Sequence, residues 1–275
     1  MKNFKKIAII GVGLIGGSLA LVIRKRYSHA EIIGVTRSKK TLRLAKKMGA
    51  IDKGFQDVSG IGDAELVVFA APVETIIRLA QEAAGIISPR CLVTDVGSTK
   101  AAITEKLQGL FPLYVGSHPL AGLEKQGVLN ANAGIFKGAS CVLTPTRHTD
   151  KSALEGIKSF WKAIGCRVVL LSPETHDKMF SFLSHLPHAV AFSLINTVPD
   201  EYLGLAASGL KDTTRIAASD SILWSDIFLS NKHILKAIDL FQKDLAGLRE
   251  AIKKGDRKRL SRILMAASKK RQGLN

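Results

Sequence analysis

Apolar and polar residues follow one another along the first 170 positions in a pattern that predicts strands and helices in turn. Short, mostly apolar runs occur at residues 7–10, 31–35, 66–71, 91–95, 114–116, 141–144 and 167–171. Such runs are typical of strands that are buried on both faces of a parallel sheet. Longer segments between them, at residues 19–26, 38–48, 74–84, 100–110 and 152–164, are typical of helices. This alternation predicts a doubly wound, parallel α/β sheet.

The pattern changes after Pro173. Residues 174–198 read as one long helix, residues 239–271 are nearly all helical in pattern, and no later segment resembles a strand. We therefore predict an α/β domain at residues 1–172, followed by an all-α domain at residues 173–275.

A glycine-rich turn joins the first predicted strand to the first predicted helix. The spacing of Gly11, Gly13 and Gly16 is that of a dinucleotide-binding turn. Gly11 permits the tight turn, Gly13 lets backbone amides approach a pyrophosphate, and Gly16 lets the helix pack closely on the strand. The helix N-terminus adds amide donors and partial positive charge. We expect these glycines, with Leu14 and Ile15 between them, to bind a dinucleotide.

The residues at the end of the second predicted strand indicate which coenzyme binds. A site for NAD usually places Asp or Glu there, where the carboxylate accepts hydrogen bonds from the ribose hydroxyls. Here the position holds Thr36, followed by Arg37 and Ser38, while Glu31 lies near the start of the strand. A carboxylate would repel a 2′-phosphate, whereas Thr36 can hydrogen-bond to it and Arg37 can pair with it. We expect these three residues to bind the coenzyme, with NADP preferred over NAD.

The charge of the chain indicates anionic partners. Lys and Arg number 40 against 23 for Asp and Glu, a formal net charge of +17. The basic residues 253–271 raise the hypothesis of nucleic-acid binding. The same segment carries Leu260, Ile263, Leu264 and Ala267 at helical spacing, so we favour an amphipathic helix with a solvated basic face. We expect a small acidic substrate and no nucleic acid.

Cysteine usage and hydropathy indicate the compartment. Cys91, Cys141 and Cys166 are far apart and odd in number, which fits neither a disulfide framework nor a zinc site. No apolar run reaches the roughly 18 residues that span a bilayer. The first strand follows the N-terminus so closely that we expect no signal peptide. We expect a cytoplasmic protein that does not bind membranes.

Polar residues gather at two predicted strand ends and in the helical domain. Ligands of open α/β sheets bind beyond the carboxyl ends of the strands, where residues 95–100 and 116–122, including His118, are expected. His185 and His188 can share a helix face, although Pro187 must bend that helix, and no further ligands stand at metal spacing. Lys211 and Arg215 are four residues apart, so that on one helix face they could bind a carboxylate.

These motifs together resemble the prephenate/arogenate dehydrogenase family, which includes cyclohexadienyl dehydrogenases of tyrosine biosynthesis. The resemblance rests on residues 11–18, 95–100, 117–122, 184–188 and 211–215, which occur in the order typical of that family. It implies a Rossmann domain followed by a helical dimerisation domain. It also implies a homodimer that converts prephenate or arogenate to 4-hydroxyphenylpyruvate or tyrosine by oxidative decarboxylation. The apolar array of the C-terminal helices (Leu235, Ile238, Leu245, Leu248 and Ile252) agrees with dimerisation.

The resemblance also implies roles for individual residues. His118 would accept the proton of the substrate hydroxyl, since a neutral imidazole with a pKa of about 6.5 suits this work near neutrality. Ser98 would hydrogen-bond to that hydroxyl or to His118, and Arg215 would hold a substrate carboxylate. The remaining residues would line or order the substrate pocket: His176, His188, Lys211 and Trp224. Glu124 is the nearby acid that could bind the ammonium of arogenate.

Two alternative functions remain open from the sequence. A β-hydroxyacid dehydrogenase also joins a Rossmann domain to a helical domain, and Lys178 or Lys211 could then be its catalytic lysine. The motif around His118 would have no purpose in such an enzyme. A non-catalytic nucleotide sensor or nucleic-acid-binding protein is the second alternative, and the positive charge motivates it.

Overall fold

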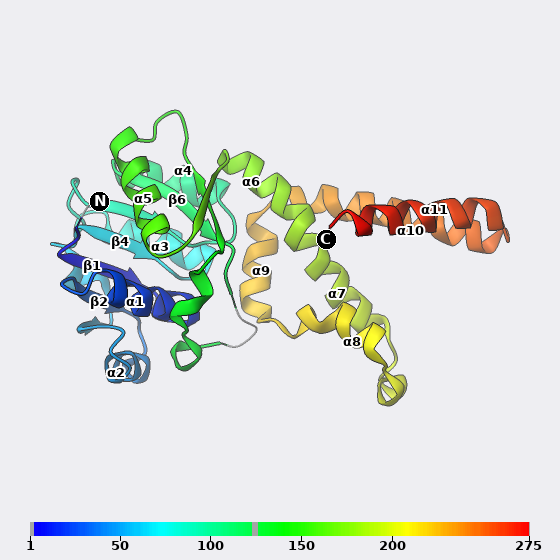
Figure 1. Cartoon of the computed structure of the whole chain (residues 1–275), viewed down its shortest axis with the longest axis horizontal. Coiled ribbons are helices and arrows are strands. Elements are labelled where there is room, and N and C mark those ends of the chain that lie inside the picture. The colour runs from blue at the N-terminus through cyan, green and yellow to red at the C-terminus, as the bar shows by residue number, and fades with distance from the viewer. Residues whose placement is uncertain (1–2, 123–125, 275) are drawn as a thin grey trace.

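The structure of the chain is a computed structural model, which describes residues 3–122 and 126–274. A globular α/β domain is followed by an elongated helical domain, whose last two helices form an arm that extends away from the sheet (Figure 1). The sheet has eight strands in the order β3-β2-β1-β4-β5-β6-β7-β8. The central position of β1 and the helical crossovers between strands are those of a doubly wound Rossmann fold, as predicted.

The strands are short and mostly buried. Their bounds are β1 (Lys6–Ile10), β2 (Glu31–Val35), β3 (Lys53–Phe55), β4 (Leu66–Phe69), β5 (Leu92–Asp95), β6 (Tyr114–Pro119), β7 (Ser140–Thr144) and β8 (Arg167–Leu170). Neighbouring strands are parallel except for β6 and β7, which pair antiparallel with His118 opposite Val142. The predicted parallel sheet is thus confirmed, with this one pair as its exception. An apolar strand has the same residue pattern in either direction, so the sequence carried no signal of the reversal.

Helices cover both faces of the sheet. Their bounds are α1 (Leu14–Arg26), α2 (Lys39–Lys47), α3 (Val73–Ala83), α4 (Ala101–Leu110) and α5 (Lys151–Ala163), with short 3₁₀ turns η1 (Val58–Ile61), η2 (Val128–Asn130) and η3 (Ala133–Phe136). Ile7 and Ile9 of β1 face the core under α1, α2 and α5, whereas Ala8 and Ile10 face the core under α3 and α4. This alternation explains why β1 is apolar at every position from Ile7 onward.

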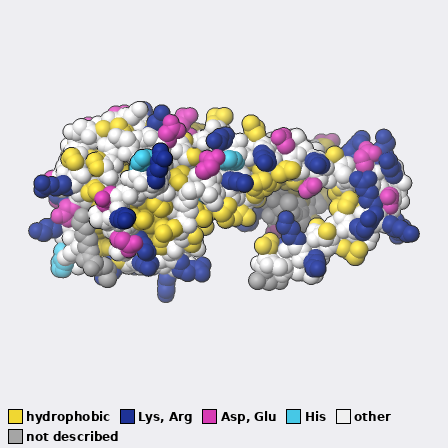
Figure 2. All heavy atoms as spheres, turned by 90° about the horizontal axis from the view of Figure 1, so that it is seen from above, with side chains coloured by type: hydrophobic (Ala, Val, Ile, Leu, Met, Phe, Trp, Pro, Cys, Tyr) yellow, Lys and Arg dark blue, Asp and Glu magenta, His cyan; other side chains and the backbone are white. Residues whose placement is uncertain are grey.

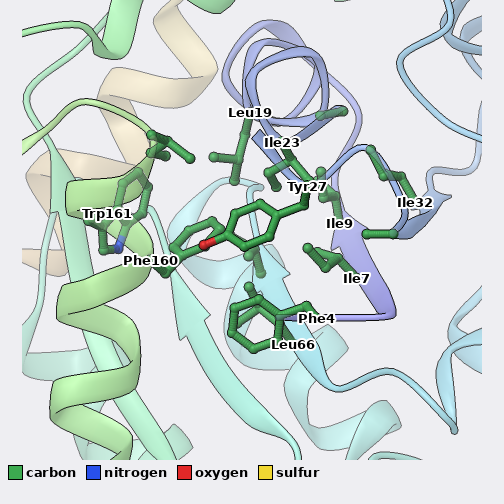
Figure 3. Packing of buried hydrophobic residues seen from close by; sticks show 14 of the residues in the cluster. Phe4, Ile7, Ile9, Leu19, Ile23, Tyr27, Ile32, Leu66, Phe160 and Trp161 are labelled. Carbon is green, nitrogen blue, oxygen red and sulfur yellow. The ribbon is translucent and has the colours of Figure 1, made fainter. Parts of the chain in front are cut away.

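The core beneath α1 and α5 is rich in aromatic side chains (Figure 3). Phe160 and Trp161 of α5 are in edge contact, with ring centroids 5.3 Å apart. Tyr27, at the end of α1, stacks on Phe160, and Phe4 packs against both Tyr27 and Phe160. A single aromatic cluster therefore joins the N-terminal segment, α1 and α5, although these segments are far apart in the sequence.

The connection between β6 and β7 crosses over α1. Its two 3₁₀ turns, η2 and η3, pack against α1. The backbone N–H of Asn132 donates to the hydroxyl of Ser18 on α1 over 2.8 Å. A Cβ atom at Gly17 would approach Val128 of η2 to 3.0 Å, so glycine permits this close contact.

Two residues separate β8 from the helical domain. Its elements are α6 (Pro173–Phe180), the π-helical turn η4 (Ser181–His185), α7 (Leu186–Thr197), η5 (Asp200–Leu205), α8 (Ser208–Thr214), η6 (Arg215–Ala218), α9 (Ser221–Ser230), α10 (His233–Lys253) and α11 (Arg257–Gln272). The long helix expected at residues 174–198 is present, with a π turn that ends just before Pro187. Since Pro187 has no N–H for the carbonyl four residues earlier, a wider turn at this point is expected.

The arm formed by α10 and α11 exposes apolar side chains. Leu235, Leu245, Ile252 and Met265 each expose half or more of their surface. In the space-filling view, apolar side chains lie along the helical domain and Lys and Arg side chains gather near the far end of the arm (Figure 2). Gly255, at φ +61°, provides the turn between the two helices.

The three cysteines are free and buried. Burial raises the pKa of the Cys166 thiol to about 11, and burial together with the neighbouring Cys166 raises the pKa of Cys141 further. In the described part of the chain, none of the helices combines the length and the apolar character that crossing a membrane requires.

Candidate active site

The glycine-rich turn between β1 and α1 has the shape that its sequence predicts. Gly11 lies at φ +104°, and a Cβ atom there would stand 2.2 Å from the carbonyl oxygen of Ala70. A Cβ atom at Gly16 would stand 1.9 Å from the carbonyl oxygen of Gly11. Gly13, by contrast, faces open space. The backbone is thus accessible at Gly13, at the start of α1, where Leu14 and Ile15 form the first turn, and this geometry fits the pyrophosphate of a dinucleotide.

The end of β2 lies beside this turn. Thr36 is half-buried and its N–H donates to the carbonyl of Phe55, while the side chains of Arg37 and Ser38 are exposed. The Ser38 hydroxyl accepts the N–H of Thr41 and so caps α2, as its sequence position predicts. The Arg37 guanidinium forms no ion pair with any residue that the structure describes, and remains available to an anion.

His118, His176 and Asp177 form a hydrogen-bonded chain across the boundary between the domains. Nδ1 of His118, on β6, is 2.8 Å from Nε2 of His176, on α6. Nδ1 of His176 is in turn 2.8 Å from Oδ1 of Asp177. Phe180 packs against both imidazole rings and shields them. β6 runs on to Pro119, past the expected strand end at Gly116, so that His118 lies within the strand near its carboxyl end.

Asp177 also caps a helix of the other domain. Its carboxylate accepts the backbone N–H groups of Lys100 and Ala101, at 2.7 and 2.9 Å, at the start of α4. Burial alone would raise the pKa of Asp177, but the hydrogen bonds from His176 and from these amides hold it below its ordinary value. Asp177 is therefore an ionised acceptor at neutral pH.

The ionised Asp177 determines which nitrogen of each histidine carries a proton. A carboxylate can only accept, so Nδ1 of His176 donates to it and Nε2 of neutral His176 is an acceptor. Nδ1–H of His118 then donates to that nitrogen, and Nε2 of His118 keeps a lone pair to which no residue that the structure describes donates. Burial, followed by the neighbouring His176, Lys100 and His185, lowers the pKa of His118 well below its usual value. His118 is therefore neutral and can accept a proton at Nε2.

A buried ion pair supports the strand that carries His118. Lys100 is fully buried, and its ammonium donates to the Asp95 carboxylate and to the carbonyl of Ser117, the latter over 2.9 Å. Asp95 also accepts the Tyr114 hydroxyl and the N–H groups of Gly97 and Ser117. The strand end before His118 and the β5–α4 loop are thus held by one cluster of polar groups.

Ser98 lies in that loop and is half-buried. It makes no hydrogen bond to His118 in the part of the chain that the structure describes, where His176 lies at Nδ1 of the ring.

A second group of the predicted residues lies in the helical domain. His188 of α7 stacks on Trp224 of α9, with ring centroids 3.5 Å apart and planes at 19°. Lys211 and Arg215 have exposed side chains on α8 and η6, which pack against α7. In the view of Figure 1, α9 lies between these helices and the sheet. Glu124 lies outside the described residues.

The sequence interpretation missed Asn231, which connects α9 to Asp177 and His185. Asn231 follows α9, and its side-chain amide donates to the carbonyl of Asp177 and lies 3.0 Å from Nδ1 of His185. This bond leaves the proton of His185 on Nε2, and burial lowers the pKa of His185 to about 4. A lone Asn in a helical region carries no sequence signal of such a role. No group of three or more His, Cys, Asp and Glu within residues 3–122 and 126–274 is arranged to hold a metal ion.

Comparison with known proteins identifies the family. Residues 19–170 match the model of the prephenate dehydrogenase nucleotide-binding domain, and residues 172–266 match that of the prephenate dehydrogenase dimerization domain. Prephenate dehydrogenase of Bacillus subtilis is 39% identical over 98% of this chain and 76% of its own length.

Solved structures agree with these matches. Prephenate dehydrogenase from Aquifex aeolicus, in complex with hydroxyphenyl propionate and NAD+, has a TM-score of 0.93 at 36% identity, over 98% of both chains. Synechocystis arogenate dehydrogenase has a TM-score of 0.84 at 31% identity, over 98% of this chain and 100% of its own. The two family models, the relative and the structures span both domains described above, and the chain therefore belongs to the prephenate dehydrogenase family.

Proposed function

We propose that the chain catalyses the oxidative decarboxylation of prephenate, arogenate or both, with hydride transfer to a nicotinamide dinucleotide. The observation that carries this proposal is the hydrogen-bonded chain His118–His176–Asp177. It leaves a neutral imidazole with a free lone pair at the carboxyl edge of the sheet that also carries the dinucleotide turn. Membership of the family supports the reaction class.

His118 is the proton acceptor in this proposal. As hydride leaves the ring carbon that bears the hydroxyl, Nε2 of His118 takes the hydroxyl proton and the C–O bond becomes a carbonyl. The charge that develops on His118 is stabilised through His176 by the Asp177 carboxylate. Asp177 therefore orients the two rings and offsets their charge without itself being protonated.

Decarboxylation completes the reaction. The bond between the ring and its carboxylate breaks, carbon dioxide leaves, and the electron pair passes through the ring to the oxygen, which takes the proton back from His118. The product is aromatic, and no net proton is released. A bound nicotinamide dinucleotide supplies the acceptor for the hydride.

NADP is the coenzyme that we expect to be preferred. Thr36 and the exposed Arg37 follow β2, where the ribose of a dinucleotide is expected, and Ser38 caps a helix that has five Lys and Arg residues and no acid in its range. This arrangement attracts the additional phosphate of NADP.

The substrate is proposed to lie between the histidine chain and the helical domain. Arg215 would hold the side-chain carboxylate that both substrates keep, because a tight hold on the departing carboxylate would oppose its loss. Lys211 and the His188–Trp224 stack would line the same pocket. Glu124 would receive the ammonium of arogenate, and the order of preference between the two substrates is left open.

The chain is proposed to divide into its two domains between residues 172 and 173 and to act as a homodimer. The exposed apolar face of α10 and α11, and the match of residues 172–266 to a dimerization domain, support the homodimer. Three free cysteines are compatible with the reducing cytoplasm, which we propose as the compartment.

Replacing the proton acceptor should abolish turnover while coenzyme binding persists. In His118→Asn, kcat should fall by roughly 10²–10⁴, the usual loss for a missing general base. Steady-state kinetics and coenzyme titration by fluorescence measure the two effects. Lys178→Ala is the control, because Lys178 would be essential only in a β-hydroxyacid dehydrogenase. Near-normal turnover of the Asn variant would remove His118 from the mechanism.

Removing Arg37 should affect the two coenzymes unequally. Arg37→Ala should raise KM for NADP much more than KM for NAD, since only NADP carries the phosphate that the guanidinium pairs with. Lys47→Ala, at the other end of α2, should leave the ratio unchanged. A higher kcat/KM with NAD than with NADP in the unaltered protein would contradict the proposed preference.

Removing Arg215 should weaken substrate binding more than turnover. A charge-assisted hydrogen bond contributes about 1.5–3 kcal/mol, so Arg215→Ala should raise KM by roughly ten- to a hundredfold. The change in kcat should be smaller, because the proposed contact is made equally before and during the reaction. An unchanged KM would refute the assignment.

The homodimer can be tested by light scattering. At micromolar concentration the mass should be twice that of the chain, and Leu245→Glu should shift it toward the single chain, because a buried unpaired carboxylate is costly. A monomeric mass of the unaltered protein would argue against the dimer.

A further inference from the structure

Helix α9 (Ser221–Ser230) joins the helical domain to the carboxyl edge of the sheet. Asp220, the residue that caps α9, accepts the side-chain amide of Gln126 from the β6–β7 connection over 2.8 Å. At the other end, the hydroxyl of Ser230 is 3.0 Å from that of Thr99 in the β5–α4 loop. Between them, Asp226 reaches the start of α3, against which α9 packs. The helix therefore contacts three segments of the sheet domain.

Asp226 caps the N-terminus of α3, whose own N-cap residue provides no capping side chain. Pro72 precedes α3 and has no side-chain group that could accept a hydrogen bond from the first turn. Both carboxylate oxygens of Asp226 lie 3.3 Å from the backbone nitrogen of Glu74. A free backbone N–H at a helix start needs an acceptor, and here the other domain provides it.

The segment that Asp226 holds belongs to the dinucleotide site. Ala70 and Ala71 connect β4 to Pro72 and α3, and the carbonyl of Ala70 lies against Gly11 of the glycine-rich turn. Any shift of α9 relative to the start of α3 is therefore also a shift of α9 relative to the dinucleotide turn.

The same helix carries part of the proposed substrate pocket. Trp224, two residues before Asp226, stacks on His188. Asn231, directly after α9, binds the carbonyl of Asp177 and contacts His185. Movement of α9 would thus displace the pocket wall and the support of the histidine chain together, in relation to the dinucleotide.

We propose that Asp226 is a positioning residue, which by capping α3 from the helical domain sets the distance between the dinucleotide turn and the substrate pocket. This inference rests on the proposed function, because it assigns the two sides of the gap to coenzyme and substrate. A misplacement of about 1 Å between reacting groups can reduce the rate by about a hundredfold.

A neutral acceptor would cost less desolvation free energy at this position than the ionised carboxylate of Asp226 does. Burial and the neighbouring Glu74 raise the pKa of Asp226, although the amides of Glu74 and Val73 favour its ionised form. A neutral acceptor would avoid the desolvation of a half-buried charge. The substitution Asp226→Asn keeps an oxygen for the Glu74 amide without that charge, whereas Asp226→Ala removes the acceptor.

Two variants and one control separate positioning from stability. Asp226→Ala should lower kcat by roughly ten- to a hundredfold and, as the loss of a helix cap, lower Tm by roughly 2–6 °C, and Asp226→Asn should restore kcat. Asp150→Ala removes a carboxylate cap of similar kind, since Asp150 accepts the N–H of Ala153 at the start of α5, away from α9. That control should lower Tm by roughly 2–6 °C and leave kcat unchanged.

Hydrogen exchange tests the cap independently of activity. The amide of Glu74 should exchange roughly two- to thirtyfold faster in Asp226→Ala, but not in Asp226→Asn. Unchanged exchange or unchanged kcat in Asp226→Ala would overturn the inference, and so would an Asn variant as impaired as the Ala variant. If the unaltered protein turned over neither prephenate nor arogenate, the proposed function would fail instead, whatever the exchange showed.

Discussion

The buried ion pair between Lys100 and Asp95 is the interaction on which the site depends. Taking two charges out of water costs several kcal/mol per ion, and their attraction offsets this only when the remaining hydrogen-bonding groups are satisfied. Here Asp95 is satisfied by Tyr114, Gly97 and Ser117, and Lys100 by the carbonyl of Ser117. The residue before His118 is therefore fixed to the loop after β5, so the proposed proton acceptor takes its position from the sheet rather than from a loop.

The carboxylate of Asp177 both joins the two domains and takes part in the proposed chemistry of the site. Asp177 accepts the first amides of α4 and, with the same carboxylate, holds His176 in the tautomer that orients His118. Docking of the helical domain thus supplies the hydrogen bond that fixes the tautomer of His118. An isolated sheet domain would present His118 without a defined partner at Nδ1.

The sequence predicted those features of the fold that depend on residues close together along the chain. The apolar runs marked seven of the eight strands because strands buried on both faces are apolar throughout, and the glycine spacing marked the dinucleotide turn because short-range sterics require glycine there. β3 was too short to be distinguished, and the reversal of β7 leaves no trace in an apolar pattern. The pairing of His118 with His176 spans 58 positions and was not predicted, because the sequence analysis gave His176 only an ordering role in the substrate pocket. Asn231 and Asp226 lie in a region without clear periodicity, where only tertiary contacts reveal their roles.

The buried cysteines have a consequence for the protein under oxidative stress. Thiolates, not thiols, react with peroxide and alkylating reagents. With the pKa of Cys166 near 11 and that of Cys141 raised further, these two buried residues contain almost no thiolate at neutral pH. The proposed chemistry uses imidazole and carboxylate groups and no sulfur. Oxidation of the cellular thiol pool should therefore leave the proposed reacting groups unchanged, unlike in enzymes with a sulfur nucleophile.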